Sequence, residues 1–446
     1  MKKISLLTAL FATALGIGTS IAQHRHHGEY KPSVYMVEFE QIEGQQCPMQ
    51  QLIAQKNDAA NNTREDFFET QRTGYHQVHN PQFVFATKDN RFALGIGGYI
   101  NLRTSYDLKG AVDNIDFIPY DIPVGKAYKN GQRVMMDATT SRLFTKAVIN
   151  SQALGRVVAF VDMDFRGGEE FSYTPRLRSA YVSMFGITAG RDVTTFCDLN
   201  SVPHMVDFEG PNAYNFNFAT MLRYEMDFLD NHMRFGVAAE MPKVSGSYGE
   251  YFSPLFQRVP DVPIYLQYSW GANRQSHFRA AAVLRNMYLR NAMKNENTSL
   301  FGWGVQASGC IDIVSMLTLR FSGTYGKGIT SYIQDLNGSG LDFIPTPNNP
   351  EHIETMPMWA WQASAQINLM PHKFWLTGGY SSVHVDQPSG VEGDLYKRGS
   401  YIFGNAFYNV TSDFTIALEY LHGARKNVDK ALGSANRLSL MLQYNF

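Results

Sequence analysis

RLSLMLQYNF, residues 437–446, alternates between two kinds of side chain at a period of two. Successive side chains of a β-strand point to opposite faces, so this segment predicts a strand with one apolar and one polar face. A methionine joins the polar face, and the apolar face ends on an aromatic residue. The apolar face is Leu438, Leu440, Leu442, Tyr444 and Phe446, and the other face is Arg437, Ser439, Gln443 and Asn445 with Met441 among them.

The same alternation recurs along the chain, and the polar faces carry charged residues. A soluble β-sandwich also alternates, but here the strands run about ten residues and aromatic residues gather near strand ends, which is typical of a barrel in lipid. We therefore predict an all-β fold, a transmembrane antiparallel β-barrel with its apolar face toward lipid and its polar face toward a lumen. The segments are GRVVAFVDMDF (155–165), RYEMDF (223–228), TLRFSGTYG (318–326) and MWAWQASAQINL (358–369).

Tight-turn signals set the number of strands. Each interval between them holds two strands and one longer polar loop, and counting from Arg91 gives sixteen strands, with fourteen and eighteen as alternatives. The turns are expected near 150–155, 184–187, 228–233, 271–276, 310–315, 369–373 and 409–413.

The N-terminal residues predict export. Lys2 and Lys3 precede an apolar run and a small-x-small site, which is the pattern of a secretory signal peptide over 1–22. Residues 23–90 then form a periplasmic extension, either a short helix or partly disordered, and 91–446 form the barrel in the outer membrane of a Gram-negative cell. Three histidines in the extension, His24, His26 and His27, could hold a metal, but a solvated terminus is the favoured interpretation, so we predict no metal site.

Composition excludes several classes of protein. The 39 basic and 40 acidic residues nearly balance, so no nucleic-acid partner is indicated. No apolar run after the signal segment is long enough for a spanning helix. The three cysteines, Cys47, Cys197 and Cys310, are far apart and indicate neither a disulfide framework nor a zinc site, although a Cys47–Cys197 bridge stays open. No HExxH, GxSxG or Walker motif occurs, so we predict no enzyme and no cofactor.

One hairpin offers candidate pore residues. Asp162 and Asp164 lie on the polar face of one strand, and Arg176 and Arg178 lie at the same period on the next. With a symmetric loop at 166–174, Asp164 faces Arg176 and Asp162 faces Arg178, all toward the lumen. Such a ladder braces the wall, contacts solutes, or does both by creating a transverse field.

The third long loop, 195–218, contains Asp207, Glu209 and a Gly210–Pro211 turn. It either folds inward, to set an acidic loop against an arginine wall and form a polar constriction, or is an ordinary exposed loop. The arginine excess on inward positions predicts a mild preference for anions. The candidate pore-lining residues are Arg142, Arg156, Asp162, Asp164, Arg176, Arg178, Asp207, Glu209, Arg223, Arg320 and Arg437.

Four segments resemble the DcaP-like trimeric outer-membrane porins, most densely over 141–224. This resemblance implies a sixteen-stranded homotrimeric channel for small, often anionic, polar solutes such as dicarboxylates, with Arg176, Arg178, Asp207 and Glu209 on the matching stretches. Two departures concern the solute range: the N-terminal coiled coil is weak, and Arg191 stands where a neutral residue is commoner. The segments are SRLFTKAV (141–148), AFVDMDFRGG (159–168), RLRSAYVSMFGITAGRDVTTFCD (176–198) and VDFEGPN (206–212).

The sequence thus predicts passive diffusion of small hydrophilic solutes through a lumen narrowed by the third loop. An outer-membrane enzyme of lipase or protease type and a structural or adhesin barrel remain alternatives. A TonB-dependent receptor would need about 22 strands and a plug, for which the chain is too short. Phe446 resembles the C-terminal aromatic signal read by the barrel assembly machinery.

Overall fold

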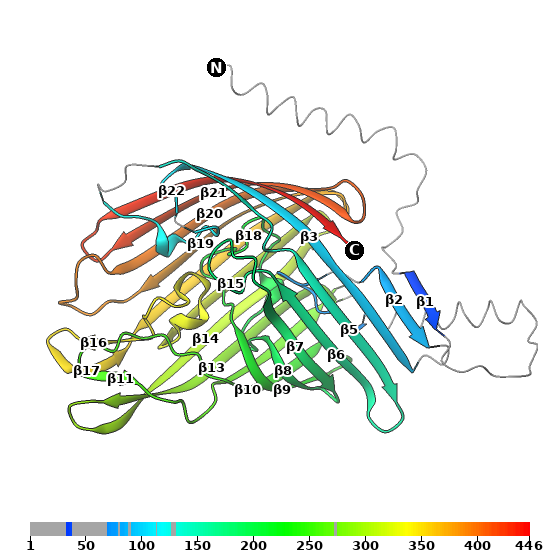
Figure 1. Ribbon diagram of the computed structural model, residues 1–446. Helices are drawn as coiled ribbons and strands as arrows, with labels where there is room; N and C mark the ends of the chain where they lie inside the picture. Colours follow the sequence, from blue (N-terminus) through cyan, green and yellow to red (C-terminus); the bar gives the residue numbers. More distant parts are fainter. Residues whose placement is uncertain are drawn as a thin grey trace, which may run out of the picture.

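The computed structural model describes residues 33–37, 69–78, 81–87, 91–112, 114–125, 131–271 and 274–446. Sixteen strands form a closed antiparallel barrel, as predicted, because the last strand, β22, pairs with the first, β3 (Figure 1). Closure gives each strand a partner on both sides, which a sheet in lipid requires. The wall strands are β3 (Phe92–Lys109), β5 (Arg142–Ser151), β6 (Gly155–Asp164), β7 (Arg176–Met184), β8 (Ile187–Val193), β9 (Phe218–Phe228), β10 (Met233–Glu240), β12 (Val262–Trp270), β13 (Ser276–Asn291), β14 (Glu296–Val314), β15 (Leu317–Lys327), β18 (Pro357–Met370), β19 (Phe374–Val385), β20 (Tyr396–Asn409), β21 (Phe414–Asn427) and β22 (Leu432–Asn445).

The two faces of the wall differ as the alternation predicted. In β22 the side chains of Leu440 and Tyr444 are 41% and 46% exposed on the outer face, whereas Arg437 on the inner face is 1% exposed. No helix among the described residues is long and apolar enough to cross a membrane. The charged residues of the strands therefore lie mainly inside the barrel, where they avoid the free-energy cost of a charge in lipid.

Short turns join consecutive strands at one end of the barrel, close to the predicted positions. The expected turn at 310–315 lies a few residues too early, because β14 continues to Val314. We call this end the short-turn end. The connections at the other end are mostly long loops, except the four-residue turns 292–295 and 428–431. The turns at the short-turn end occupy 152–154, 185–186, 229–232, 271–275, 315–316, 371–373 and 410–413.

Six further strands accompany the wall. Two of them lie at the short-turn end, where β2 pairs with the first residues of β3 and β1 pairs with β2 in parallel (Figure 1). The others extend wall strands or form a hairpin in a long loop. Their bounds are β1 (Ser33–Val37), β2 (Phe83–Thr87), β4 (Arg133–Asp137), β11 (Phe252–Pro254), β16 (Phe343–Thr346) and β17 (Asn349–Thr355).

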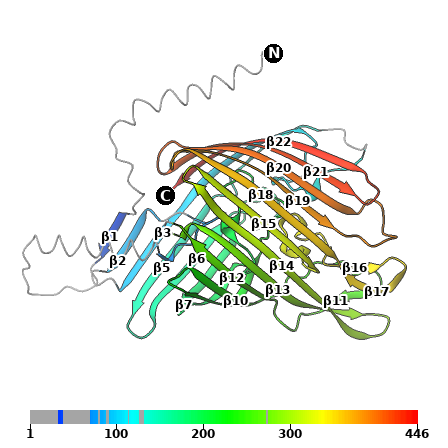
Figure 2. The same ribbon diagram turned by 180° about the vertical axis from the view of Figure 1, so that it is seen from behind.

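Three long loops fold into the barrel: the first loop (110–132), the third loop (194–217) and the sixth loop (328–356). The wall of β10 to β18 that surrounds them is seen from outside in Figure 2. Phe117 of the first loop and Tyr214 of the third pack with Tyr401 of β20 in one buried cluster, and Ile333 of the sixth loop belongs to a second. Sequence analysis expected only the third loop inside. The loops contain the short 3-10 helices η2 (Pro119–Asp121), η3 (Leu199–Ser201), η5 (Thr330–Tyr332) and η6 (Gln334–Leu336).

Barrel closure generates a first prediction. Gly98 exchanges backbone hydrogen bonds of 2.9 and 3.0 Å with Phe446, and a Cβ at Gly98 would lie 2.2 Å from the carbonyl oxygen of Arg142. A Gly98→Val variant should therefore fail to pair β3 with β5 and should lose the folded, heat-modifiable band on electrophoresis in detergent. The matched control is Ile100→Val on the outer face, where the side chain is 61% exposed. Equal amounts of the folded band from both variants would contradict this account.

Candidate functional site: the charged lumen

Carboxylates and guanidinium groups alternate on the inner face of β6 and β7. Asp164 lies opposite Arg176, as predicted, and accepts hydrogen bonds of 2.6 Å from Arg176 and 2.9 Å from Arg178. Arg178 is 1% exposed, while the side chain of Arg176 keeps 35% of its surface open. Charge-assisted hydrogen bonds of this kind hold the side chains in fixed positions.

The predicted pairing of Asp162 with Arg178 is wrong by one residue. A β-bulge shifts the register between Asp162 and Met163, so Asp162 lies opposite Ser179 and Arg178 is the extra residue of β7. Arg178 consequently leans toward Asp164, and its Nε stays 3.7 Å from Asp162. The sequence did not reveal this bulge because a symmetric loop was assumed.

Three other predicted arginines are buried in ion pairs on the inner face. Arg142 of β5 forms a two-bond pair with Asp162. Arg223 of β9 contacts Asp192 at 2.8 Å, and Arg437 of β22 forms a two-bond pair with Asp107. Each guanidinium is neutralised by a wall carboxylate, so these pairs brace the wall more than they attract a solute.

Two predicted residues lie in different surroundings. Arg156 stands at the short-turn end, where its side chain is 40% exposed and contacts Glu69 at 2.6 Å. Arg320 of β15 donates to the neutral Gln366 at 2.9 Å, and no carboxylate in the described part of the chain lies within 4.0 Å of it. Arg279, which sequence analysis did not select, also has neutral partners: it donates to the carbonyl of Cys197 and covers the ring of Tyr265 at 3.5 Å.

Wall carboxylates anchor the third loop by its backbone. Glu240 of β10 accepts the N–H of Thr195 at 2.6 Å, and Glu419 of β21 accepts those of Val206 and Asp207 at 3.0 and 2.7 Å. Buried backbone donors require partners, so these acids allow the loop to cross the lumen. Neither was among the predicted residues, although Glu419 in FTIALEY is a lone acid in a largely apolar stretch, which is the signal that could have found it.

The tip of the third loop holds Asp207 and Glu209, and both are buried. Asp207 accepts from the N–H of Phe117 and the hydroxyl of Tyr401 and lies 3.6 Å from Arg103 of β3. Its cationic neighbour is thus Arg103 rather than the arginines of β7. The ring of Phe208 faces those arginines instead, with the guanidinium of Arg178 5.3 Å away.

The buried acids of the loops differ in their proton affinity. Burial raises the pKa of Glu209 well above its usual range, and the nearby Asp116 and Asp207 add to this effect. Burial also opposes ionisation of Asp116, but the guanidinium groups of Arg166 and Arg103 outweigh it and lower the pKa of that acid. Glu209 also has one buried carboxyl oxygen without a hydrogen-bond partner, so a neutral carboxylic acid fits this position better than a carboxylate.

Asp335 of the sixth loop joins the three inward loops. It accepts from the N–H of Tyr120 in the first loop, from Asn212 in the third, and from the hydroxyl of Tyr396 in the wall. Burial raises the pKa of Asp335 to about 7. Nothing in the local sequence distinguished this residue, because its partners come from distant segments.

A serine, a histidine and an aspartate meet inside the barrel, but they do not form a nucleophile and base. Ser308 and His277 both bond to the same oxygen of Asp198, at 2.7 and 2.9 Å. Acyl transfer needs the serine on the histidine, so the trio only fixes the start of the third loop. Cys197 beside it is a free thiol whose sulfur lies 3.1 Å from the hydroxyl of Tyr214. Cys47, the other end of the bridge that the sequence left open, lies outside the described residues.

Within the described residues, no group of three or more His, Cys, Asp or Glu side chains is arranged to hold a metal. The histidines His24, His26 and His27 and the predicted signal segment lie outside those residues. The barrel does contain open space. A cavity of about 380 Å³ lies between the third loop and the short-turn end, and Arg223, Glu225, Arg279 and Tyr265 are part of its lining.

Comparison with known families identifies the relatives of this barrel. The model of the family described as "DcaP outer membrane protein" matches residues 31–255, which is half of the chain. The chain belongs to the DcaP outer membrane protein family. The family is one of outer-membrane proteins. No curated protein matches this chain significantly.

Solved structures share the fold of this DcaP family member. The outer membrane channel DcaP of Acinetobacter baumannii has a TM-score of 0.69 and 19% identity, over 80% of this chain and 97% of that one. A loop L8 deletion mutant of OmpT from Vibrio cholerae has a TM-score of 0.52 and 10% identity, over 80% and 100%. An anion-selective porin from Comamonas acidovorans has a TM-score of 0.52 and 9% identity, also over 80% and 100%. At these identities the likeness concerns the fold alone.

The raised pKa of Glu209 generates a second prediction. The folded protein holds this proton more tightly than the unfolded chain, so the stability linked to it is full below the ordinary value of about 4.3 and is lost as the pH rises through the folded value. A Glu209→Gln variant lacks the titration and should unfold on the order of 2 °C above wild type at pH 8, with no difference at pH 4. Thermal unfolding in detergent tests this. An equal difference at both pH values would mean that the charge of Glu209 is not the cause.

Proposed function

We propose that this protein lets small hydrophilic solutes diffuse passively across the outer membrane, with a preference for anions. The observation that carries the proposal is the imbalance of partners in the lumen. Most inner arginines form ion pairs with carboxylates, but Arg320 donates to the neutral Gln366, and Arg279 forms its hydrogen bond with a backbone carbonyl although Asp198 is in electrostatic range. A guanidinium without a counter-charge in a narrow aqueous space attracts anions and repels cations.

The solute class follows from chemistry and from family likeness together. The cavity of about 380 Å³ admits small organic molecules rather than polymers. The solved anion-selective porin from Comamonas acidovorans has the same barrel fold, so an anion preference is compatible with this architecture. Small dicarboxylates are the anions that the resemblance to DcaP-like porins implies, and we propose them as solutes.

The remaining expectations accompany this proposal. We propose that residues 1–22 direct export, that residues 23–90 are a periplasmic extension of which 69–78 enters the barrel, and that Phe446 is read by the barrel assembly machinery. The apolar outer face supports contact with outer-membrane lipid. We further propose a homotrimer, as the family resemblance implies; cross-linking of the native membrane would reveal it. A lack of hydrolysis of esters and peptides by purified protein would separate the channel from an outer-membrane enzyme.

Single-channel recording gives the third prediction. Wild type should pass current in a planar bilayer. In a salt gradient, its reversal potential should be shifted from zero toward the equilibrium potential of chloride. Arg320→Gln should lower the chloride-to-potassium permeability ratio up to about fivefold, since a unit charge at 4 Å in water is worth about 1 kcal/mol.

The matched control is Arg290→Gln. Arg290 also bonds neutral partners, Asn295 and Asn297, but it lies toward the loop end outside the lumen, so its loss should leave the ratio unchanged. Cation selectivity of wild type would contradict the anion preference. Absence of any conductance, in wild type and in the variants of the next section, would contradict the channel and favour a structural barrel.

A further inference from the structure

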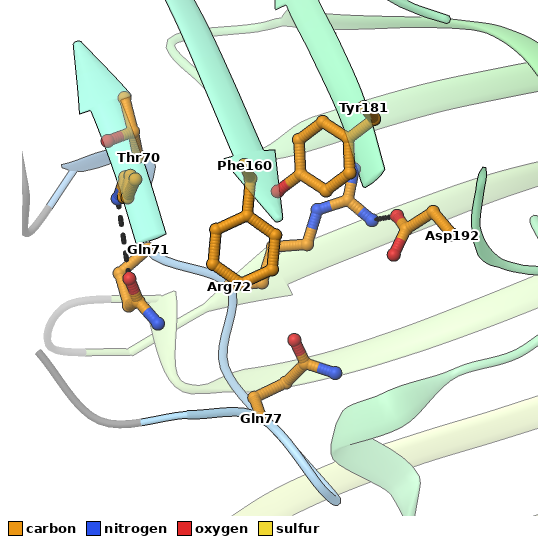
Figure 3. A pocket seen from close by; sticks show the side chains of 8 residues that line it. Thr70, Gln71, Arg72, Gln77, Phe160, Tyr181 and Asp192 are labelled. Atoms are coloured by element: carbon orange, nitrogen blue, oxygen red, sulfur yellow. Dashed lines mark hydrogen bonds and ion pairs between the residues drawn. The ribbon is translucent and has the colours of Figure 1, made fainter. Parts of the chain in front are cut away.

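Residues 69–78 lie inside the barrel, beneath the third loop, although they precede the first wall strand by many residues. Arg72 forms an ion pair with Asp192 of β8, and its guanidinium lies 4.9 Å from the ring of Tyr181. Figure 3 shows this side chain beside the rings of Phe160 and Tyr181, with its end group on Asp192. Both ends of the segment point to the short-turn end: Glu69 contacts the exposed Arg156 there, and β2, which follows in the chain, pairs with the first residues of β3.

Tyr75 and His76 contact the third loop itself. The hydroxyl of Tyr75 lies 3.0 and 3.1 Å from the carbonyl oxygens of Asp207 and Phe208, and its N–H donates to the carbonyl of Leu199 at 2.8 Å. The His76 ring stacks on Phe208 with centroids 4.1 Å apart. These contacts reach both the start and the tip of the loop, so the segment holds the loop across its width.

Glycines on both partners permit this close approach. Gly74 has a φ of +110°, and a Cβ there would lie 2.6 Å from the carbonyl carbon of Leu199. Gly210 at the loop tip has a φ of +73°, and a Cβ there would lie 2.5 Å from the hydroxyl of Tyr75. At two separate points, a glycine thus allows the segment and the third loop to approach more closely than a residue with a Cβ would. This fit distinguishes a formed binding site from incidental contact.

The ion pairs of the wall do not depend on residues 69–78. If Arg72 left, Asp192 would keep Arg223 at 2.8 Å and Ser179 at 3.0 Å. Arg142, which also donates to the carbonyl of His76, would keep its pair with Asp162. Among the charged wall residues, Lys146 of β5 does contact the segment, because its ammonium donates to the neutral Gln71 at 3.3 Å. Water that enters the vacated lumen would replace this neutral partner, so the charge would not be left buried and unpaired. The segment can therefore detach while the barrel stays intact.

We propose that the inner site beneath the third loop is a peptide-binding site, occupied by the chain's own residues 69–78, and that this segment is a removable plug that limits the conductance. The proposal rests on the proposed channel function. Residues 69–73 form one side of the cavity below the third loop, so their departure would open that cavity toward the short-turn end of the barrel. The segment also braces Phe208 and Gly210, so the loop tip gains freedom when it leaves.

Full-length protein with Arg72→Ala and Tyr75→Ala tests the plug. We expect the single-channel conductance to rise roughly twofold, because the narrowest part of a pore sets its conductance. Gly210→Ala, which pushes against Tyr75 from the loop side, should cause a similar rise and gives an independent answer if the double variant does not fold. Arg290→Gln is the control, since Arg290 belongs neither to the segment nor to the third loop and does not line the cavity. Conductance equal to wild type in both altered channels would overturn the proposal.

Addition of the peptide in trans separates plugging from general loosening. The synthetic peptide ETQRTGYHQV, which copies residues 69–78, should restore the wild-type conductance of the double variant when added on the short-turn side. The same peptide with Tyr75→Ala should not restore it. If the conductance of the double variant is raised but neither peptide lowers it, the segment is a strut and not a plug. Absence of current from wild type and all variants would instead refute the channel itself.

Discussion

The interior of this barrel depends on hydrogen bonds between buried wall carboxylates and the backbone of the third loop. A loop that leaves the rim and crosses the lumen takes its N–H groups away from bulk water, and Glu240 and Glu419 accept several of them from opposite sides. A carboxylate accepts more than one donor and needs no side chain from the loop. The loop is therefore free to use its own side chains to pack against the first and sixth loops.

The lumen contains two kinds of charged side chain: those in buried ion pairs and those whose hydrogen bonds go to neutral groups. The ion pairs of Arg142, Arg223 and Arg437 are buried and complete, so they resemble a framework that fixes the wall. Arg320 of β15 donates to the neutral Gln366, and Arg279 of β13 donates to a backbone carbonyl within electrostatic range of Asp198. The sum over all residues is close to neutral, which conceals this local imbalance. Selectivity in such a lumen comes from the arrangement of partners and not from net charge.

Sequence patterns were enough for the architecture and insufficient for the interior. Alternation and turn signals located the sixteen strands, because a period of two is imposed on every strand with one face in lipid. The pairing of Asp164 with Arg176 followed from a symmetric hairpin, but the bulge that displaces Arg178 did not, because the prediction assumed an unbroken alternation across β6 and β7. Asp335 and the segment around Tyr75 acquire their partners from positions hundreds of residues away or from backbone atoms, and no local pattern records such contacts.

The first and last wall strands differ in length: β3 has 18 residues and β22 has 14. The excess of β3 lies at the short-turn end, beyond Phe446, where β2 pairs with Ala93 to Ile96. An uncovered strand edge is a template for pairing with other chains. Strand β2 thus covers the edge of β3 at the point where β22 ends. A chain without β2 would leave this edge unpaired, and the edge would be prone to pair with neighbouring chains before or after insertion into the membrane.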